Sequence, residues 1–335
     1  MMINIKRIFK NLLEKKDLND SEASKLVQLI FSNKLSEIEI SSILTLLYLK
    51  EEGFDEIFSF VEYLRKKSES ISLKGELMDT CGTGGDNKNS FNFSTATSIL
   101  LSACNVKIVK HGNRSITSKS GSFDVLESLG VNINLNKEAQ KKFFKKNNIC
   151  FLFAPNFHNS LKSVSSIRQK LPFRTIFNLL GPLLNPCKLK YQLLGVSKKQ
   201  NLITHAKCLS KIKIKSAWVV FNINGYDELT TTSPNIILEV KNGKISKEKK
   251  IHPNDLGFQV RKEEELRGGT GQENAYMMKR LFEGETGAIR DNVLLNTSAG
   301  LLISNKVKNL KEGIELSKKI IDSGKASKKL EELVR

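Results

Sequence analysis

Three glycines and a dense set of hydroxyl and amide side chains follow the first predicted strand. The segment runs from Asp79 through Gly82-Thr83-Gly84-Gly85-Asp86, and a helix is predicted to begin near Ser94. Glycines lack Cβ atoms, so backbone amides can close around the oxygens of an anion. Asn92, Ser94 and Thr95 would stand at the helix N-terminus, where unpaired amides and the helix dipole favour phosphate. The spacing matches neither the P-loop nor the dinucleotide fingerprint. It favours a phosphate loop over an ordinary capped turn.

A second loop with chemistry runs from Lys110 through His111-Gly112-Asn113-Arg114-Ser115 to Ser122, again between a predicted strand and a helix. Loops at the ends of parallel strands meet at one edge of the sheet, where α/β proteins bind ligands. One loop offers amides and hydroxyls and the other offers cations, which is the combination that a diphosphate needs. A lone loop histidine such as His111 is more often a hydrogen-bonding residue than a catalyst.

Two further segments carry candidate ligands. Asp227-Glu228 follows a predicted strand, and adjacent carboxylates suit Mg²⁺, although a solvated turn is the default for such a pair on its own. Beside a diphosphate site the metal interpretation gains weight. Arg168 and Arg174 border an apolar stretch that ends at Pro186, which fits a ligand carboxylate and ring as well as it fits a structural turn.

The elements that position these residues fall into two groups. Apolar residues at helical spacing predict four helices within the first seventy residues, around 5–13, 20–31, 37–48 and 55–64. From about residue 76, short apolar runs alternate with helical stretches, which predicts a mostly parallel α/β sheet. The strand candidates are 77–80, 106–109, 149–153, 192–196 and 217–221; the later helix candidates are 197–209, 271–283, 287–302 and 307–321; 238–250 is predicted as an exposed, charged hairpin or loop.

Composition narrows the function classes. The formal charge of +19 comes mostly from Lys in scattered, polar segments, which favours a solvated surface over a dedicated nucleic-acid interface. No apolar stretch approaches the roughly 18 residues of a membrane span, and the N-terminus lacks the features of a signal peptide. Five scattered Cys without a C-x-x-C pair argue against zinc or disulfides. We expect a cytoplasmic protein that contacts neither membrane nor nucleic acid.

Taken in order, these motifs resemble the anthranilate phosphoribosyltransferases of tryptophan biosynthesis. The match also includes Arg267-Gly268-Gly269 with Glu273-Asn274-Ala275, and Arg290-Asp291 with Leu295-Asn296, so that it covers nearly the whole chain. The resemblance implies a helical N-terminal domain (1–72, with a return segment near 170–190) and an α/β domain (73–335) with a central, mostly parallel sheet. It also implies a homodimer through the helical domain.

The activity implied by the resemblance is transfer of the 5-phosphoribosyl group from phosphoribosyl diphosphate to the amine of anthranilate, with Mg²⁺ as two ions. Positioning and stabilisation of the leaving diphosphate replace a catalytic nucleophile. Implied metal ligands are Ser94, Asp227 and Glu228, and anthranilate would meet Gly82, Asn113 and Arg168. Implied contacts to phosphoribosyl diphosphate are Gly82, Gly85, Asp86, Ser90, Asn92, Phe93, Ser94, Thr95, Lys110, His111, Gly112, Asn113, Arg114, Ser115, Ile116, Thr117, Ser118 and Ser122.

Three positions differ from common members of the family: Lys88 and Ser90 in the first loop, and Pro172 near Arg168. They bear on affinity rather than on the reaction. Two other functions are compatible with the fold but are less well supported than the phosphoribosyltransferase. A nucleoside phosphorylase of the same fold type is disfavoured by the intact second loop and the carboxylate pair. A nucleic-acid-binding relative would require a continuous lysine stripe and no metal carboxylates.

Overall fold

The structure, a computed structural model, describes residues 5–115 and 119–334 and divides into two compact units. The first comprises Met1–Ser70 and Pro155–Pro186, and the second comprises Ile71–Ala154 and Cys187–Arg335. The first unit is helical in its regular structure, and the second contains the sheet. A helical N-terminal domain and a larger α/β domain with a mostly parallel sheet were predicted from the sequence, and this fold class is confirmed.

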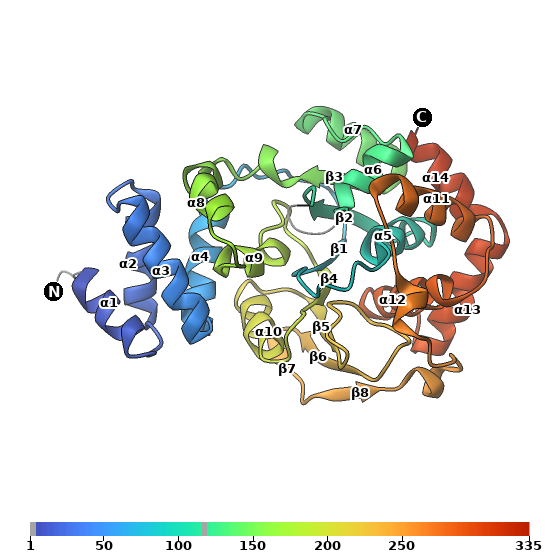
Figure 1. Ribbon diagram of the computed structural model, residues 1–335. Coiled ribbons are helices and arrows are strands. Elements are labelled where there is room, and N and C mark those ends of the chain that lie inside the picture. The colour runs from blue at the N-terminus through green and yellow to red at the C-terminus, as the bar shows by residue number, and fades with distance from the viewer. Residues whose placement is uncertain (1–4, 116–118, 335) are drawn as a thin grey trace. The chain divides into compact units, whose positions relative to one another are not determined.

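The helical unit begins with four helices where apolar periodicity predicts them. They are α1 (Ile5–Leu13), α2 (Asp20–Phe31), α3 (Glu37–Lys50) and α4 (Phe54–Lys67) (Figure 1). Capping boxes start α2 and α3, in which Asn19 and Ser36 each accept a hydrogen bond from the N3 amide. The buried Glu56 pairs with Lys50 at 2.9 Å and accepts the amide hydrogens of Leu18 and Gly53. Its charge is therefore compensated inside the unit.

A return segment completes the helical unit, and it begins earlier than the predicted 170–190. It includes two short helices, α8 (Ser165–Lys170) and α9 (Ile176–Leu180), and the 3₁₀ turn η2 (Asn159–Val164). The Glu69 amide donates to the Phe157 carbonyl, and Phe177 packs edge-on against Phe60. The 3₁₀ turns before residue 165 have no apolar period, so the sequence pattern offered no sign of them.

The sheet of the second unit has the order β3-β2-β1-β4-β5-β6-β7, with β8 paired to β6. Its five parallel strands are β1 (Leu77–Gly82), β2 (Lys107–Gly112), β3 (Ile149–Phe153), β4 (Tyr191–Gly195) and β5 (Ser216–Asn222). The antiparallel strands are β6 (Asn235–Lys241), β7 (Lys244–Ile245) and β8 (Lys249–Ile251). The segment 238–250 was predicted as an exposed, charged hairpin or loop. The β6–β7 hairpin agrees with this prediction, and the exposure predicted for Leu238 and Val240 is wrong. Ile237, Leu238 and Val240 are buried in β6, whose alternating polar residues disguise it.

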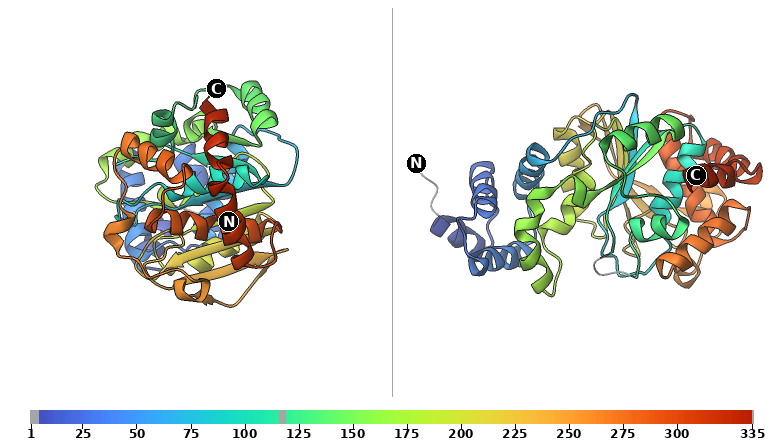
Figure 2. Two further views of the ribbon diagram at one scale, coloured as in Figure 1. Left: turned by 90° about the vertical axis from the view of Figure 1, so that its right-hand side faces the viewer. Right: turned by 90° about the horizontal axis from the view of Figure 1, so that it is seen from above.

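Helices cover both faces of this sheet (Figures 1 and 2). On one face α5 (Phe93–Ala103) packs against β1 and β2, and α12 (Ala288–Ile303) packs against α5 and β4. On the other, α10 (Asn201–Lys211) packs against β5 and β6. The remaining helices are α6 (Ser122–Leu129), α7 (Lys137–Asn147), α11 (Gly271–Phe282), α13 (Leu310–Asp322) and α14 (Lys325–Val334).

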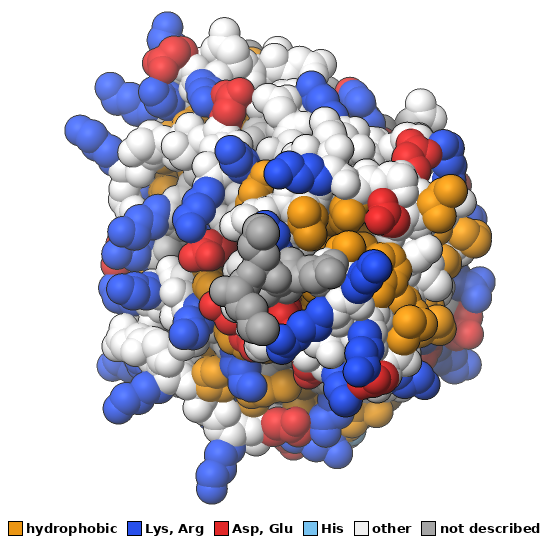
Figure 3. All heavy atoms as spheres, turned by 90° about the vertical axis from the view of Figure 1, so that its left-hand side faces the viewer, with side chains coloured by type: hydrophobic (Ala, Val, Ile, Leu, Met, Phe, Trp, Pro, Cys, Tyr) orange, Lys and Arg blue, Asp and Glu red, His pale blue; other side chains and the backbone are white. Residues whose placement is uncertain are grey.

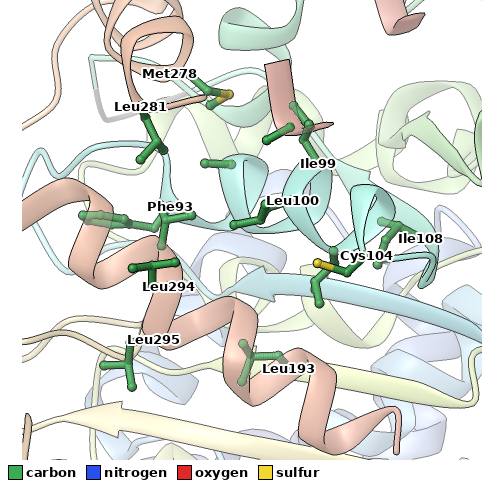
Figure 4. Close-up of a cluster of buried hydrophobic side chains, with 14 of the residues drawn as sticks. Phe93, Ile99, Leu100, Cys104, Ile108, Leu193, Met278, Leu281, Leu294 and Leu295 are labelled. Carbon is green, nitrogen blue, oxygen red and sulfur yellow. The ribbon is translucent and has the colours of Figure 1, made fainter. Parts of the chain in front are cut away.

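Apolar side chains from α5, α11, α12 and the sheet form one continuous core. Figure 4 shows Phe93 and Leu100 of α5 between Leu281 of α11, Leu294 of α12 and Leu193 of β4. This packing fixes the start of α5 relative to the strand ends. Within the described residues, no helix is both long and apolar enough to cross a bilayer.

Candidate functional site

The strand order reverses between β1 and β4, and the glycine loop and the Asp227-Glu228 turn meet there. In the sheet, β2 lies on one side of the β1–β4 pair and β5 lies on the other. The chain therefore leaves β1 and β4 in opposite directions, which opens a crevice at the ends of these two strands. The Thr83 amide donates to the Gly195 carbonyl, which joins the two strand ends. The Asp227-Glu228 turn lies over this junction, where Asp227 Oδ2 accepts the Gly84 amide at 2.6 Å.

Two glycines make this close approach possible. A Cβ atom at Gly82 would lie 2.0 Å from Asp227 Oδ2, and one at Gly195 would lie 1.5 Å from the Asp227 carbonyl oxygen. Neither position has the positive φ that glycine alone adopts readily. The requirement is therefore steric: any side chain at either position would displace the acidic turn.

Glu228 bridges the acidic turn to the N-terminus of α5. Its Oε1 accepts the Ser94 amide at 3.1 Å, while its Oε2 is buried and lacks a hydrogen-bond partner among the described residues. Burial raises the pKa of the Glu228 carboxyl well above its usual value, and the neighbouring Asp227 and Asp86 raise it further. A buried oxygen without a partner, beside two more carboxylates, is an arrangement that a cation would complete.

Lys110 lies beneath the start of α5 and is buried. Its ammonium group donates to the Thr80 carbonyl at 2.8 Å and to Ser94 Oγ at 3.1 Å. Burial lowers the pKa of Lys110, and Asp79, Cys81 and Glu228 oppose that shift. In this structure Lys110 therefore orients the Ser94 hydroxyl.

A polar cavity of about 150 Å³ opens between the two predicted loops and the acidic turn. Of the predicted site residues, it brings together Gly85, Asp86, Ser90, Asn92, Ser94, Asp227 and Glu228; the others lining it are Gly84, Asn89, Phe91, Lys119, Ser120 and Gly269. Phe93 and Thr95 are buried in α5 instead, and the Phe93 amide donates to the Phe91 carbonyl.

The second loop has its described ends tied to α6. Asp124 Oδ2 accepts the amides of Ser115 and Gly121, at 2.9 and 2.7 Å. Arg114 forms two parallel hydrogen bonds to Glu127, and the Ser122 hydroxyl donates to the Asn113 carbonyl. His111 and Gly112 end β2. The predicted residues Ile116, Thr117 and Ser118 lie outside the described residues.

The segment 266–269 forms a further wall of the site, beside the two loops and the acidic turn, and its role was not predicted from the sequence. Backbone pairing joins residues 89–91 to residues 266–268, with the Phe91 amide donating to the Leu266 carbonyl and the Gly268 amide to the Asn89 carbonyl. The available signal was the paired glycines Gly268-Gly269 before a helix, since a Cβ at Gly268 would lie 2.7 Å from the Ser90 carbonyl oxygen. Lys88 also contacts this wall, through an ion pair with Glu263 at 2.8 Å.

The residues predicted to receive anthranilate belong to different units. Gly82 and Asn113 lie in the α/β unit, and Arg168 lies in α8 of the helical unit. The Arg168 guanidinium stands 5.2 Å from the centre of the Phe177 ring, and burial lowers its pKa. Pro172 is exposed beyond α8. The arginine is thus held against an aromatic ring within its own unit.

Comparisons with known proteins agree with this architecture along nearly the whole chain. Residues 74–327 match the glycosyl transferase family α/β domain, and residues 6–68 match its helical bundle domain. An anthranilate phosphoribosyltransferase of Petrotoga mobilis is 44% identical over 319 residues, covering 95% of this chain and 92% of its own length.

Two solved structures are similar in fold as well. The anthranilate phosphoribosyltransferase of Thermus thermophilus aligns with a TM-score of 0.88 at 33% identity, covering 97% of each chain. The enzyme of Saccharomyces cerevisiae, in complex with phosphoribosyl diphosphate and Mg, aligns with a TM-score of 0.88 at 28% identity and covers 97% of this chain and 95% of its own. The chain belongs to the glycosyl transferase family with these two domains, and within it to the anthranilate phosphoribosyltransferases.

Proposed function

We propose that this protein transfers the 5-phosphoribosyl group from phosphoribosyl diphosphate to the amine of anthranilate, releasing diphosphate. The product is N-(5-phosphoribosyl)anthranilate, formed in the second step of tryptophan biosynthesis from chorismate. One observation carries the proposal: the glycine loop, the N-terminus of α5 and the Asp227-Glu228 turn converge on one polar cavity at the sheet's switch point.

The phosphoribosyl diphosphate site is built from the two loops. Gly85, Asp86, Ser90, Asn92 and Ser94 supply amides and polar side chains around the cavity. Lys119, from the second loop, lines the same cavity and supplies positive charge. Lys110, His111, Gly112, Asn113, Arg114, Ser115 and Ser122 continue the proposed site along the second loop, with Gly82, Phe93 and Thr95 on the first.

Ser94, Asp227 and Glu228 are the proposed Mg²⁺ ligands, for two ions. The donor set fits, because these are hard oxygens and Glu228 Oε2 is buried without a hydrogen-bond partner among the described residues. In the part of the chain that the structure describes, no three or more Asp, Glu, His or Cys side chains are grouped as a metal site would need. Mg²⁺ usually takes one or two carboxylates and completes its shell with water and substrate phosphates. Bound there, it would neutralise charge on the departing diphosphate.

The remaining catalysis comes from positioning. The anthranilate amine is itself a nucleophile, so the protein needs to hold it in line with the anomeric carbon while diphosphate leaves. Amides of the glycine loop and the dipole of α5 stabilise the negative charge that develops on the leaving group. Gly82, Asn113 and Arg168 receive anthranilate, with the Arg168 guanidinium facing its carboxylate.

The function is tested by the loss of anthranilate fluorescence in the presence of phosphoribosyl diphosphate and Mg²⁺. The wild-type protein is expected to consume anthranilate, and failure of folded protein to do so would overturn the proposal. The variant Asp227→Asn with Glu228→Gln should abolish turnover or raise the Mg²⁺ requirement without unfolding. Glu51→Gln with Glu52→Gln, an adjacent pair in the helical unit, is the matched control and should leave turnover unchanged.

We infer, in addition, that two copies associate through the helical unit. Leu13, Ile38 and Leu49, on α1 and α3, are 67%, 79% and 62% exposed. A groove of about 570 Å³ adjoins them. Its lining combines three apolar residues, Ile5, Phe9 and Leu13, with the charged residues Lys6, Lys10, Glu14 and Glu39. Figure 3 shows hydrophobic side chains grouped on this side of the molecule, with Lys and Arg scattered around them. Apolar surface of this kind marks an interaction site. We also propose a cytoplasmic location for the reaction, since both of its substrates are charged and water-soluble.

A further inference from the structure

One buried side chain connects the two loops that line the cavity. Asn274, in the first turn of α11, accepts the Asn92 amide on its Oδ1 at 2.9 Å. Its Nδ2 donates to Ser120 Oγ at 3.1 Å and to the carbonyls of Gly269 and Thr270 at 2.9 and 3.1 Å. The side chain is almost fully buried. Its carboxamide therefore has partners in the first loop, the second loop and the turn before α11.

The contacts matter because they join segments that lie far apart in the sequence. Asn92 follows β1, and Ser120 follows β2, and both line the 150 Å³ cavity. Gly269 lines it as well, from the wall that pairs with residues 89–91. Asn274 is thus a side chain that contacts all three segments enclosing the proposed diphosphate position.

The chemistry of the link is specific to a carboxamide. The Asn92 amide needs an acceptor, while the Gly269 and Thr270 carbonyls need donors. A carboxylate would satisfy the first and repel the other two. An apolar side chain would remove all of these side-chain hydrogen bonds, and of the three groups the Thr270 carbonyl would keep its bond from the backbone amide of residue 274. Gln would place the same group one methylene farther from the helix, beside Gly268. The space there is tight, because a Cβ atom added to Gly268 would lie 2.8 Å from Asn274 Oδ1.

We propose that Asn274 is a positioning residue that sets the separation of the two phosphate loops, acting through the Asn92 amide and the Ser120 hydroxyl. This inference rests on the proposed function, because the loops matter as the two sides of a phosphoribosyl diphosphate site. Asn274 is not itself expected to touch the substrate.

A matched control exists in the same helix. Thr270 is the N-cap of α11, and its hydroxyl accepts the Glu273 amide at 3.3 Å without contacting either loop. Thr270→Ala should weaken the helix as a lost cap does, while the Thr270 carbonyl remains available to Asn274. Comparing it with Asn274→Ala separates the positioning of the loops from the stability of α11.

The first measurement needs no substrate. Hydrogen–deuterium exchange of the ligand-free proteins should show faster exchange in peptides containing Asn92 and Ser120 for Asn274→Ala. For Asn274→Asp, which keeps an acceptor for the Asn92 amide, the faster exchange is expected in the Ser120 peptide, and Thr270→Ala should leave both peptides unchanged. The result stands whether or not the protein is a phosphoribosyltransferase, so it distinguishes failure of this inference from failure of the proposed function. Equal exchange in all variants would overturn the inference.

The second measurement is the Kd for phosphoribosyl diphosphate with Mg²⁺, by calorimetry. We expect Asn274→Asp to raise it about tenfold or more, as loss of buried hydrogen bonds to a binding loop does, and Thr270→Ala to leave it within about twofold. Ser120→Ala, which removes one of the links, should give an intermediate Kd if Asn274→Ala does not fold. Unchanged Kd for Asn274→Asp and Ser120→Ala would contradict the role.

Discussion

At the scale of single residues, the site depends on two glycines, Gly82 and Gly195, as much as on its polar side chains. The hydrogen atom at Gly195 allows the Asp227 carbonyl to lie over the end of β4. Gly195→Ala would place a methyl group in that space and push the acidic turn away, at a cost of about 1–3 kcal/mol in stability. We expect Mn²⁺ affinity, measured by electron paramagnetic resonance, to fall about tenfold or more.

The control for this substitution is Gly181→Ala. A Cβ at Gly181 meets no atom within 4 Å, and its φ of −44° suits alanine, so metal affinity and stability should stay near those of the wild type. If Gly195→Ala bound Mn²⁺ as tightly as Gly181→Ala does, the acidic turn would not be the metal site.

His158 gives the helical unit a pH dependence. The pKa of His158 is lowered to about 4, mainly by burial and to a lesser extent by the nearby Arg65, and a hydrogen bond with the backbone of Leu184 opposes the shift. An unfolded chain binds this proton near pH 6.5, whereas the folded chain does not, so stability is complete above pH 6.5 and is lost as the pH falls toward 4. The full loss is roughly 3 kcal/mol.

His158→Gln should remove that dependence. We expect the difference in melting temperature between wild type and His158→Gln to shift in favour of the variant as the pH falls from 7 to 4, and to stay constant from pH 7 to 8. The difference removes the contributions of other titrating groups, because both proteins share them. Parallel pH profiles would show that the pKa of His158 is the same in the folded and the unfolded protein.

At the scale of elements, α12 holds the acidic turn from behind. Asn296 donates to the Leu229 carbonyl at 2.7 Å and accepts the Leu229 amide at 3.2 Å. One helical turn earlier, Asn292 accepts the Thr231 amide at 2.8 Å. These carboxamides lie on one face of the helix, as residues four apart do, and together fix the backbone that follows Glu228.

Asn296→Leu should therefore loosen the turn without touching the cavity. We expect Mn²⁺ affinity to fall about tenfold, because two buried backbone groups of Leu229 lose their partners. Thr297→Val is the control from the same helix: Thr297 is equally buried, and its hydroxyl has no hydrogen-bond partner among the described residues. Equal metal affinity in the two variants would show that α12 does not hold the acidic turn in place.

The elements also show where sequence patterns are sufficient. The first four helices and the five parallel strands follow from apolar spacing, since each buries one stripe or both faces. The helix α14 was not predicted, because its many lysines obscure Ala326, Leu330 and Leu333, which are all buried. A pattern dominated by charge on the exposed face hides the few positions that decide packing.

The site divides in a similar way. The glycine loop, the second loop and the acidic pair each have a local chemical signature, so the sequence alone pointed to them. The roles of Asn274 and Asn296 depend on which segments meet in space, and their own segments resemble ordinary helix. That information lies in the strand order and helix packing, which single-sequence patterns do not contain.

At the scale of the whole molecule, the net charge of +19 is spread over the surface. Several lysines pair with nearby carboxylates, such as Lys215 with Glu76 and Lys249 with Glu239, both in the α/β unit. The cavity, in contrast, combines Lys119 with Asp86, Asp227 and Glu228. Binding of an anionic substrate therefore depends on local amides, cations and metal rather than on the overall charge.

The apolar face of α1 and α3, formed by Leu13, Ile38 and Leu49, predicts a dimer. A monomer that leaves Leu13 and Ile38 in water keeps a hydrophobic surface exposed, and pairing two copies would bury it at a gain of about 25 cal/mol for each Å². We expect light scattering after gel filtration to give twice the chain mass for the wild type and the single chain mass for Leu13→Glu with Ile38→Glu. Val260→Glu changes a residue that is 51% exposed in the α/β unit, and should keep the wild-type mass. Unchanged circular dichroism in each variant would show that only association had been altered, and a wild-type protein at the single chain mass would refute the pairing.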